Sequence, residues 1–281
     1  MTKLLQLWVD KARLMAEKDA QGLMGPCGLA QYLCTLAALM LPTGVEAAEW
    51  SSTELHLQVG RLDVPSFAGG GSADHLIYTL QHASRWKYGN LFFFVDVQDS
   101  RERGFQDFDA YGEAYANLSL GKISGKPVDF GPVSDIGLIG GVNWSVDTKV
   151  RKYAAGVRLA LSFKGFAFAN LDVMALVDDS GGIASGGAPA QDDTVVVDFN
   201  FARPFQIGGA DFSIEGHIEY AGERTNELGG KVESWILAQP QLQWHVSERV
   251  AVGIEYQFWM NKLGDGSTDE SAVLALFVWE F

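Results

Sequence analysis

The chain has 281 residues, a hydrophobic content of 47% and a formal net charge of −14 at pH 7. This length suits one large domain or two small ones. The acidic balance argues against a nucleic-acid-binding protein, which needs a basic face to displace phosphate counterions, so no nucleic acid polymer is expected as a partner. No segment reaches the roughly 18 consecutive apolar residues of a transmembrane helix.

Residues 1–48 have the pattern of a cleaved signal peptide. Basic residues precede the apolar stretch 28–42, and small residues suited to cleavage follow it. The basic segment is unusually long, which leaves an internal start at Met15 or Met24 open. The alternative is a buried helix at the start of a soluble domain. Both cysteines fall within this segment, so the mature chain is predicted to contain no disulfide.

From Trp50 onward, apolar and polar residues alternate with a period of two. For example, Leu55, Leu57 and Val59 share one face, opposite Glu54 and His56. Such segments occur in chain order at 53–62, 74–84, 86–98, 108–120, 133–145, 149–162, 165–177, 193–203, 210–220, 234–246, 249–261 and 270–281. They are longer than the mean strand of about five or six residues and suit a tilted transmembrane strand of about 9–11. Residues 49–281 therefore predict an all-β fold: a 12-stranded antiparallel transmembrane β-barrel of the bacterial outer membrane.

The connections between these segments differ in length at the two ends of the predicted barrel. An even number of strands places both termini on the periplasmic side, with mostly short turns there and long loops rich in Gly, Asp and Ser outside. Two connections depart from this rule. Residues 121–132 are long where a short turn is expected, and 146–148 are short where a long loop is expected. Both departures suggest that the predicted boundaries of the adjoining strands are in error by a few residues.

The last segment, ending "ALFVWEF", places aromatic residues at alternating positions. Phe277, Trp279 and the terminal Phe281 share the face predicted to contact lipid, at the aromatic girdle of the periplasmic interface. This pattern is similar to the signal that the barrel assembly machinery reads. The alternative is the final strand of a soluble sandwich, which seldom needs twelve such strands.

Directing each apolar face to lipid leaves a lumen face that carries aromatic rings and charges of both signs. Barrels of about eight strands fill themselves with side chains and those of about sixteen leave a wide channel, so twelve predict a narrow, lined passage. The rings either pack on one another or offer a flat ligand a stacking face, and the ionisable groups either hold the barrel's shape or bind sugar hydroxyls. The predicted lumen residues are Phe92, Phe94, Asp96, Asp109, Tyr111, Glu113, Tyr115, Arg158, Lys164, Phe166, Phe168, Asp172, Glu215, Glu255 and Trp259.

Three stretches carry a resemblance to a known family: "YGEAYANLSLGKISG" (111–125), "WILAQPQLQWHV" (235–246) and "VGIEYQFWMNKLGDGSTDESAVLALFVWEF" (252–281). With them the chain resembles the nucleoside-specific outer-membrane channels, Tsx and OmpK-like. The resemblance implies a monomeric twelve-stranded barrel whose narrow pore, lined by aromatic and ionisable side chains, passes nucleosides by facilitated diffusion. Its implied surroundings are outer-membrane lipid and lipopolysaccharide. Some relatives serve as phage or colicin receptors through their exposed loops.

Two other functions compete with a channel. An enzyme is not expected, because none of the five histidines lies in a recognisable nucleophile motif. A non-conducting structural or adhesin barrel is the second alternative. No cofactor is expected. A metal site is not expected either, since "DGSTDE" (265–270) has carboxylate and hydroxyl oxygens but lacks the full spacing of a calcium loop.

Overall fold

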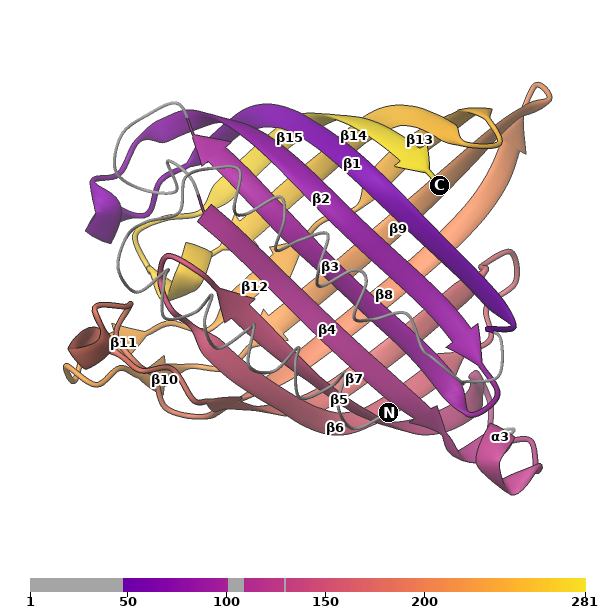
Figure 1. Ribbon diagram of the computed structural model, residues 1–281, viewed down its shortest axis with the longest axis horizontal. Helices are drawn as coiled ribbons and strands as arrows, with labels where there is room; N and C mark the ends of the chain where they lie inside the picture. The colour runs from indigo at the N-terminus through magenta and orange to yellow at the C-terminus, as the bar shows by residue number, and fades with distance from the viewer. Residues whose placement is uncertain (1–47, 101–108, 129) are drawn as a thin grey trace, which may run out of the picture. The chain divides into compact units, whose positions relative to one another are not determined.

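The computed structural model describes residues 48–100, 109–128 and 130–281, and the predicted signal peptide lies outside them. Residues 48–281 form a barrel of antiparallel strands that run obliquely around its wall (Figure 1). The strands are β1 (Trp50–Asp63), β2 (Ser72–Trp86), β3 (Gly89–Ser100), β4 (Asp109–Ser119), β5 (Val133–Ser145), β6 (Arg151–Leu161), β7 (Phe168–Asp178), β8 (Thr194–Ile207), β9 (Ala210–Ala221), β12 (Trp235–Ala238), β13 (Gln241–Ser247), β14 (Val250–Met260) and β15 (Glu270–Glu280).

The sheet closes on itself. The last strand, β15, pairs with β14 on one side and with β1 on the other, where Leu55 lies opposite Trp279. The strands β12 and β13 are two halves of a single crossing, because both pair with β9 and with β14. Twelve antiparallel strands therefore surround the lumen, as the sequence predicts. A small hairpin of β10 (Arg224–Thr225) and β11 (Lys231–Val232) lies outside this sheet.

The two faces of the wall differ as the alternation requires. His56 is 2% exposed inside the barrel, whereas Val59 on the opposite face of β1 is 52% exposed. At the end of the barrel that holds Trp50, exposed aromatic side chains lie around the outer wall. There Phe281 stacks on Trp279 with ring centroids 5.8 Å apart. An apolar exterior bounded by aromatic rings and a polar interior is the pattern of a barrel in a bacterial outer membrane. The chain is accordingly an outer-membrane β-barrel.

The connections divide between two ends, which we name by their contents. The terminal end holds the start of the first strand and the end of the last strand. Its turns are mostly short, such as 87–88, 208–209 and 248–249. The loop end holds the long connections 64–71, 179–193, 222–234 and 261–269. The two departures from this rule are real features. The long β4–β5 connection at the terminal end begins with α3 (Leu120–Ser124), and the β5–β6 turn at the loop end is short.

In the part of the chain that the structure describes, no helix is long and apolar enough to cross a membrane.

The tenth crossing is interrupted at Gln239–Pro240, between β12 and β13, although its register against β9 and β14 is the same on both sides of the interruption. The amide of Gln239 donates to His217 O at 3.0 Å, and the amide of Tyr256 donates to Pro240 O at 3.0 Å, so the pairing resumes on both sides. Opposite this interruption, Gly216 has a φ of +139°, and a Cβ there would lie 2.2 Å from Gln239 O. Only glycine fits this position without displacing backbone atoms.

We expect Gly216→Ala to lower the free energy of unfolding by about 1–3 kcal/mol, because the new Cβ meets backbone and the required φ is strained for alanine. Urea unfolding of the refolded barrel in lipid vesicles measures this. Gly140→Ala is the matched control, since the nearest atom to a Cβ there is Ala154 O at 3.6 Å. Equal stability of the two variants would contradict the role assigned to Gly216.

Candidate functional site

Four lumen-facing rings form one connected surface on β3 and β4, which we call the aromatic wall: Phe92, Phe94, Tyr111 and Tyr115. The ring centroids of Phe92 and Phe94 are 6.1 Å apart, and those of Phe94 and Tyr111 are 6.0 Å apart. Tyr115 lies directly opposite Phe92 in the register of the two strands. All four rings are half-buried, so part of each ring faces the space inside the barrel.

Two polar groups hold the edge of the aromatic wall. The hydroxyl of Tyr111 donates to the Glu113 carboxylate, and the hydroxyl of Tyr115 donates to Asn143 Oδ1 at 2.7 Å. Asn143 in turn donates to Glu113 Oε1 at 2.9 Å. The hydroxyls of Tyr111 and Tyr115 thus find their hydrogen-bond partners along the barrel wall. The faces of the two rings remain available for stacking on the lumen side.

Amides and carboxylates gather on β9 and β12–β14, and we call this surface the amide wall: Glu215, Gln239, Gln241, Gln243, Glu255 and Gln257. These groups bond to one another. Gln243 donates to Glu215 at 2.6 Å, and Gln241 donates to Glu255 at 2.7 Å. Gln239 lies on the same face as Gln241, and its side chain donates to Gln257 Oε1 at 2.9 Å. In the order of the twelve strands, β9 and the tenth crossing lie half-way round from β3 and β4, so the two walls face each other.

Hydrogen bonds continue from the amide wall around the lumen in both directions. On one side, Glu255 accepts from Gln58 of β1 at 2.6 Å. On the other side, Gln239 contacts His217 at 2.9 Å and His217 contacts Asp198 at 2.7 Å. The series goes on through Asn200, Asp172 and Arg158 and ends at Asn90 of β3. These links form a polar belt that fixes the lining over most of the circumference.

Most of the predicted lumen residues lie on the inner face. The strand register places Asp96, Arg158 and Asp172 there with the members of the two walls, and Trp259 packs against lumen-facing Trp235 with centroids 6.4 Å apart. Asp109 also faces inward, but at the loop end, where it accepts from Ser145 and from the amide of Asp147. Its carboxylate holds the β5–β6 turn.

Three predicted lumen residues lie at the terminal end, away from the two walls. Lys164 and Phe166 belong to the β6–β7 connection, because β7 begins only at Phe168. Phe166 packs edge-on against Phe201, which faces outward, and Arg203 lies over its ring. The placement of Phe166 in the lumen is therefore wrong, since alternation was extended through a turn. Phe168 is 48% exposed at the rim.

Neighbouring loops at the loop end are tied to each other. Glu227 accepts from the amides of Ile183 and Ala190, which joins the loops after β7 and β9. Next to the seam between β1 and β15, Asp265 accepts from the amide of Ser66 at 2.6 Å. Beside it, Lys262 forms a buried ion pair with Glu270 at 2.6 Å. The described loops thus form one bonded rim around this end of the lumen.

Hydrogen bonds and burial set the ionisation of two groups on this rim. Burial alone would raise the pKa of Asp265, but hydrogen bonds from Ser66, Ser267 and Thr268 outweigh it and lower the pKa to about 2. Burial lowers the pKa of Arg224 to about 10, and its guanidinium stacks over Trp235 at 4.1 Å. Both groups therefore stay charged at neutral pH.

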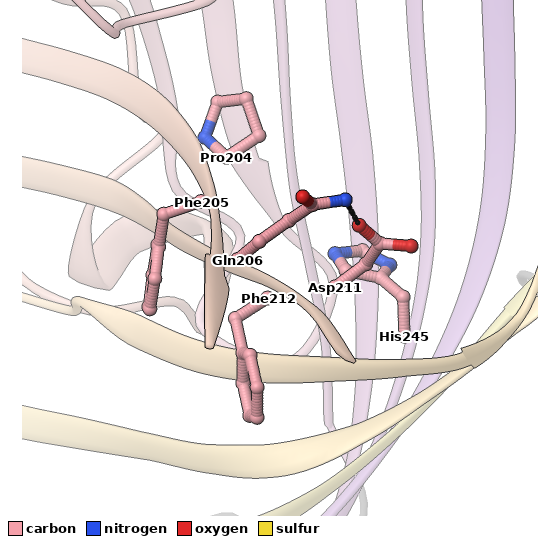
Figure 2. A pocket seen from close by; sticks show the side chains of 6 residues that line it. All are labelled: Pro204, Phe205, Gln206, Asp211, Phe212 and His245. Carbon is pink, nitrogen blue, oxygen red and sulfur yellow. Dashed lines mark hydrogen bonds between the residues drawn. The ribbon is translucent and has the colours of Figure 1, made fainter. Parts of the chain in front are cut away.

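A separate hollow of about 400 Å³ lies at the terminal end, at the base of the β8–β9 hairpin (Figure 2). Its lining comes from both sides of the wall: Phe205 and Phe212 stack on the outer side, whereas Asp211 and His245 belong to the inner face. Gln206 donates to Asp211 at 2.7 Å within it. This hollow is a feature of the rim and is distinct from the space between the two walls.

The described residues offer little for catalysis. His245 Nε2 lies 2.9 Å from the hydroxyl of Ser213, but within these residues no acceptor holds Nδ1 of that histidine, so no third group orients a Ser–His pair. No group of three or more His, Cys, Asp or Glu among residues 48–100, 109–128 and 130–281 could hold a metal ion.

No family model matches the chain, and no curated protein matches it. Solved structures that resemble it include the KdgM porin, with a TM-score of 0.43 and 10% identity over 82% of this chain and 99% of that chain. The NanC porin has a TM-score of 0.46 and 11% identity over 81% of this chain and 100% of that chain. Outer membrane phospholipase A from Escherichia coli has a TM-score of 0.46 and 11% identity over 81% and 95%. Likeness this loose carries no argument about cargo or activity.

The acid dependence of the Ser66–Asp265 contact follows from the low pKa of Asp265. A carboxyl whose pKa falls from an ordinary 3.8 to about 2 stabilises its contacts above about pH 4 and loses that contribution as the pH falls towards 2. We expect the hydrogen-exchange protection of the Ser66 amide, corrected for intrinsic exchange, to fall across this window.

Asp265→Asn should remove the pH dependence of this protection. Asp269→Asn should keep it, because Asp269 accepts from the amide of Asn261 instead. Protection of Ser66 that stays constant between pH 5 and 2 in the native chain would contradict the assignment.

Proposed function

We propose that this barrel is an outer-membrane channel for facilitated diffusion of nucleosides. The observation that carries the proposal is the opposition of the two walls across the lumen. The aromatic wall offers Phe92, Phe94 and Tyr111 as stacking faces, and the amide wall offers donors and acceptors such as Gln239 and Gln241. A nucleoside carries a flat base and a hydroxyl-rich sugar, which need these two surfaces at once.

The strength of such contacts suits passage. Stacking of a base on an aromatic side chain contributes about 1–3 kcal/mol, and side-chain amides exchange hydrogen bonds with water at little net cost. Several weak sites in series let a solute enter and leave, whereas one strong site would retain it. With the termini on the periplasmic side, the solute would enter past the bonded loop rim and leave at the terminal end.

The sequence resemblance to nucleoside-specific channels supports the same cargo. Its segment 111–125 carries Tyr111 and Tyr115 of the aromatic wall, and 235–246 carries Gln239, Gln241 and Gln243 of the amide wall. The stretches that carry the resemblance therefore supply part of each wall, whereas Phe92, Phe94 and Glu215 lie outside them.

Other partners are part of the proposal. Outer-membrane lipid and lipopolysaccharide would surround the apolar exterior, and the chain would act as a monomer. Phe277, Trp279 and Phe281 lie exposed on the outer face, where the barrel assembly machinery could recognise them. A non-conducting structural or adhesin barrel, or a phage or colicin receptor, is the second candidate, favoured by the loops bonded to one another at the rim.

A planar-bilayer experiment tests the channel and its cargo together. We expect nucleosides to reduce the single-channel current in a saturable way. Phe92→Ala with Phe94→Ala should raise the half-saturating concentration roughly thirtyfold, since each of the two lost stacking contacts contributes about 1 kcal/mol. Phe93→Ala is the matched control, because Phe93 lies between them but faces outward and stacks on His82. Absence of any current would favour the non-conducting candidate, and equal half-saturation in both variants would remove the two rings from the binding site.

Charge on the lumen surface gives a second test. On the inner face of the strands, carboxylates such as Glu54, Asp198 and Glu219 outnumber the basic Arg85, Lys152 and Arg158. A negative lumen concentrates cations, so the reversal potential in a KCl gradient should indicate preference for K⁺ over Cl⁻. Glu215→Gln with Glu255→Gln keeps the shape of these side chains and should weaken the preference; a native channel that prefers Cl⁻ would contradict this account of the lumen.

A further inference from the structure

Arg158 of β6 binds partners on two different strands. Its Nε and Nη2 donate to the two carboxylate oxygens of Asp172 on β7 at 2.7 and 2.6 Å. Its Nη1 donates to Asn90 Oδ1 on β3 at 3.0 Å. Asp172 is the neighbour of Arg158 in the strand register, but Asn90 belongs to a strand that does not pair with β6.

The hydrogen bond from Arg158 to Asn90 does not follow the barrel wall from strand to strand. The strands β4 and β5 separate β3 from β6, and neighbouring strands lie about 4.8 Å apart, so the two anchors are about 14 Å apart along the wall. Because the wall is curved, the direct line between them cuts across the inside of the barrel. The guanidinium therefore stands in the lumen in front of β4 and β5. We call this the Arg158 crossbar.

Its anchor is firm. Asp172 is 2% exposed and also accepts from Asn200 Nδ2 at 3.0 Å. A planar guanidinium that makes two parallel bonds to one carboxylate has little freedom to turn. Arg158 is thus held in its crossing position from the β7 side, and Asn90 fixes the other end.

The crossbar lies nearer the terminal end of the barrel. Asn90 is the second residue of β3 from that end, and Arg158 is three residues before β6 ends there at Leu161. We propose that Arg158 narrows the conduit at this level and sets the upper size of solute that passes. This inference rests on the proposed channel function and names the residue that limits it.

Two kinds of variant distinguish the steric effect of the Arg158 crossbar from the effect of its charge. Asn90→Ala removes the far anchor while leaving the Arg158–Asp172 pair. Arg158→Met with Asp172→Asn removes the bar without changing the net charge and leaves no buried carboxylate unpaired. The matched control is Arg151→Met with Asp179→Asn, a similar pair joined at 2.6 Å on the same strand but exposed at the loop end.

Single-channel conductance and liposome swelling with neutral sugars of increasing size measure the effect. We expect the Arg158→Met, Asp172→Asn variant to conduct at least about 1.5-fold more than the native barrel and to admit larger sugars. Asn90→Ala should move both readouts in the same direction, and the control should move neither. Heat-modifiable migration on gels confirms that each variant is folded.

The outcomes distinguish the inference from the function on which it rests. A native barrel that conducts, with folded variants of unchanged conductance and sugar cut-off, overturns the crossbar and leaves the channel standing. A native barrel that is closed but opens in the Arg158→Met, Asp172→Asn variant supports the crossbar as the obstruction. Closed channels in the native barrel and in every folded variant overturn both.

Discussion

The structure depends on one constraint: no backbone N–H or C=O can remain unpaired against hydrocarbon. The pairing of β1 with β15 satisfies it, since Glu54–Val59 match Ala275–Glu280 along the seam and leave no free edge. Closure then divides every strand between a lipid face and a lumen face. It also explains the apolar inner face of β15, where Leu274, Leu276 and Val278 are buried. These residues pack with Leu62 and Ile77 or with Ala251, which makes the seam a packed region of the interior.

Inside the closed wall, most polar groups satisfy one another, and Trp259 Nε1 and Asn117 Oδ1 are among the few buried atoms that have no hydrogen-bond partner within the described residues. The belt from Gln58 through Glu255, Gln239 and His217 to Arg158 uses amides and imidazole as bridges between carboxylates. A buried polar group left without a partner costs about 1–3 kcal/mol, so such a chain fixes each rotamer by its neighbours. Thr79 of β2 lies 3.5 Å from Gln58 and donates to Asp96 of β3 at 2.6 Å, so the belt also reaches β3 from this side. It is interrupted where Phe92 and Phe94 lie between Asn90 and Asp96. The rings therefore occupy the one stretch of β3 where the belt does not continue.

Period-two alternation was sufficient to predict the wall and its faces. Side chains alternate along β3, and its register with β2 pairs Phe94 with Gln81 and Asp96 with Thr79 on the inner face. Alternation fails wherever the strand does. Phe166 lies in a turn. The need for glycine at Gly216 comes from Gln239 on the neighbouring strand, which the local pattern does not contain. The contact of Gln58 with Glu255 joins residues 197 apart, and the Arg158–Asn90 bond crosses two strands. Such contacts require the closure and stagger of the whole barrel.

The way the carboxylates are satisfied bears on what the lumen can admit. Glu215 and Glu255 accept from neutral amides, and among the described residues only Asp172 receives a bidentate guanidinium. An amide orients a carboxylate and satisfies its lone pairs, but it leaves the negative charge in place. The faces of aromatic rings also carry negative electrostatic potential. Both walls therefore present negative potential to the solute although one is polar and the other apolar. Anionic solutes are disfavoured on both sides, whereas a neutral flat solute can stack on one wall and hydrogen-bond to the other.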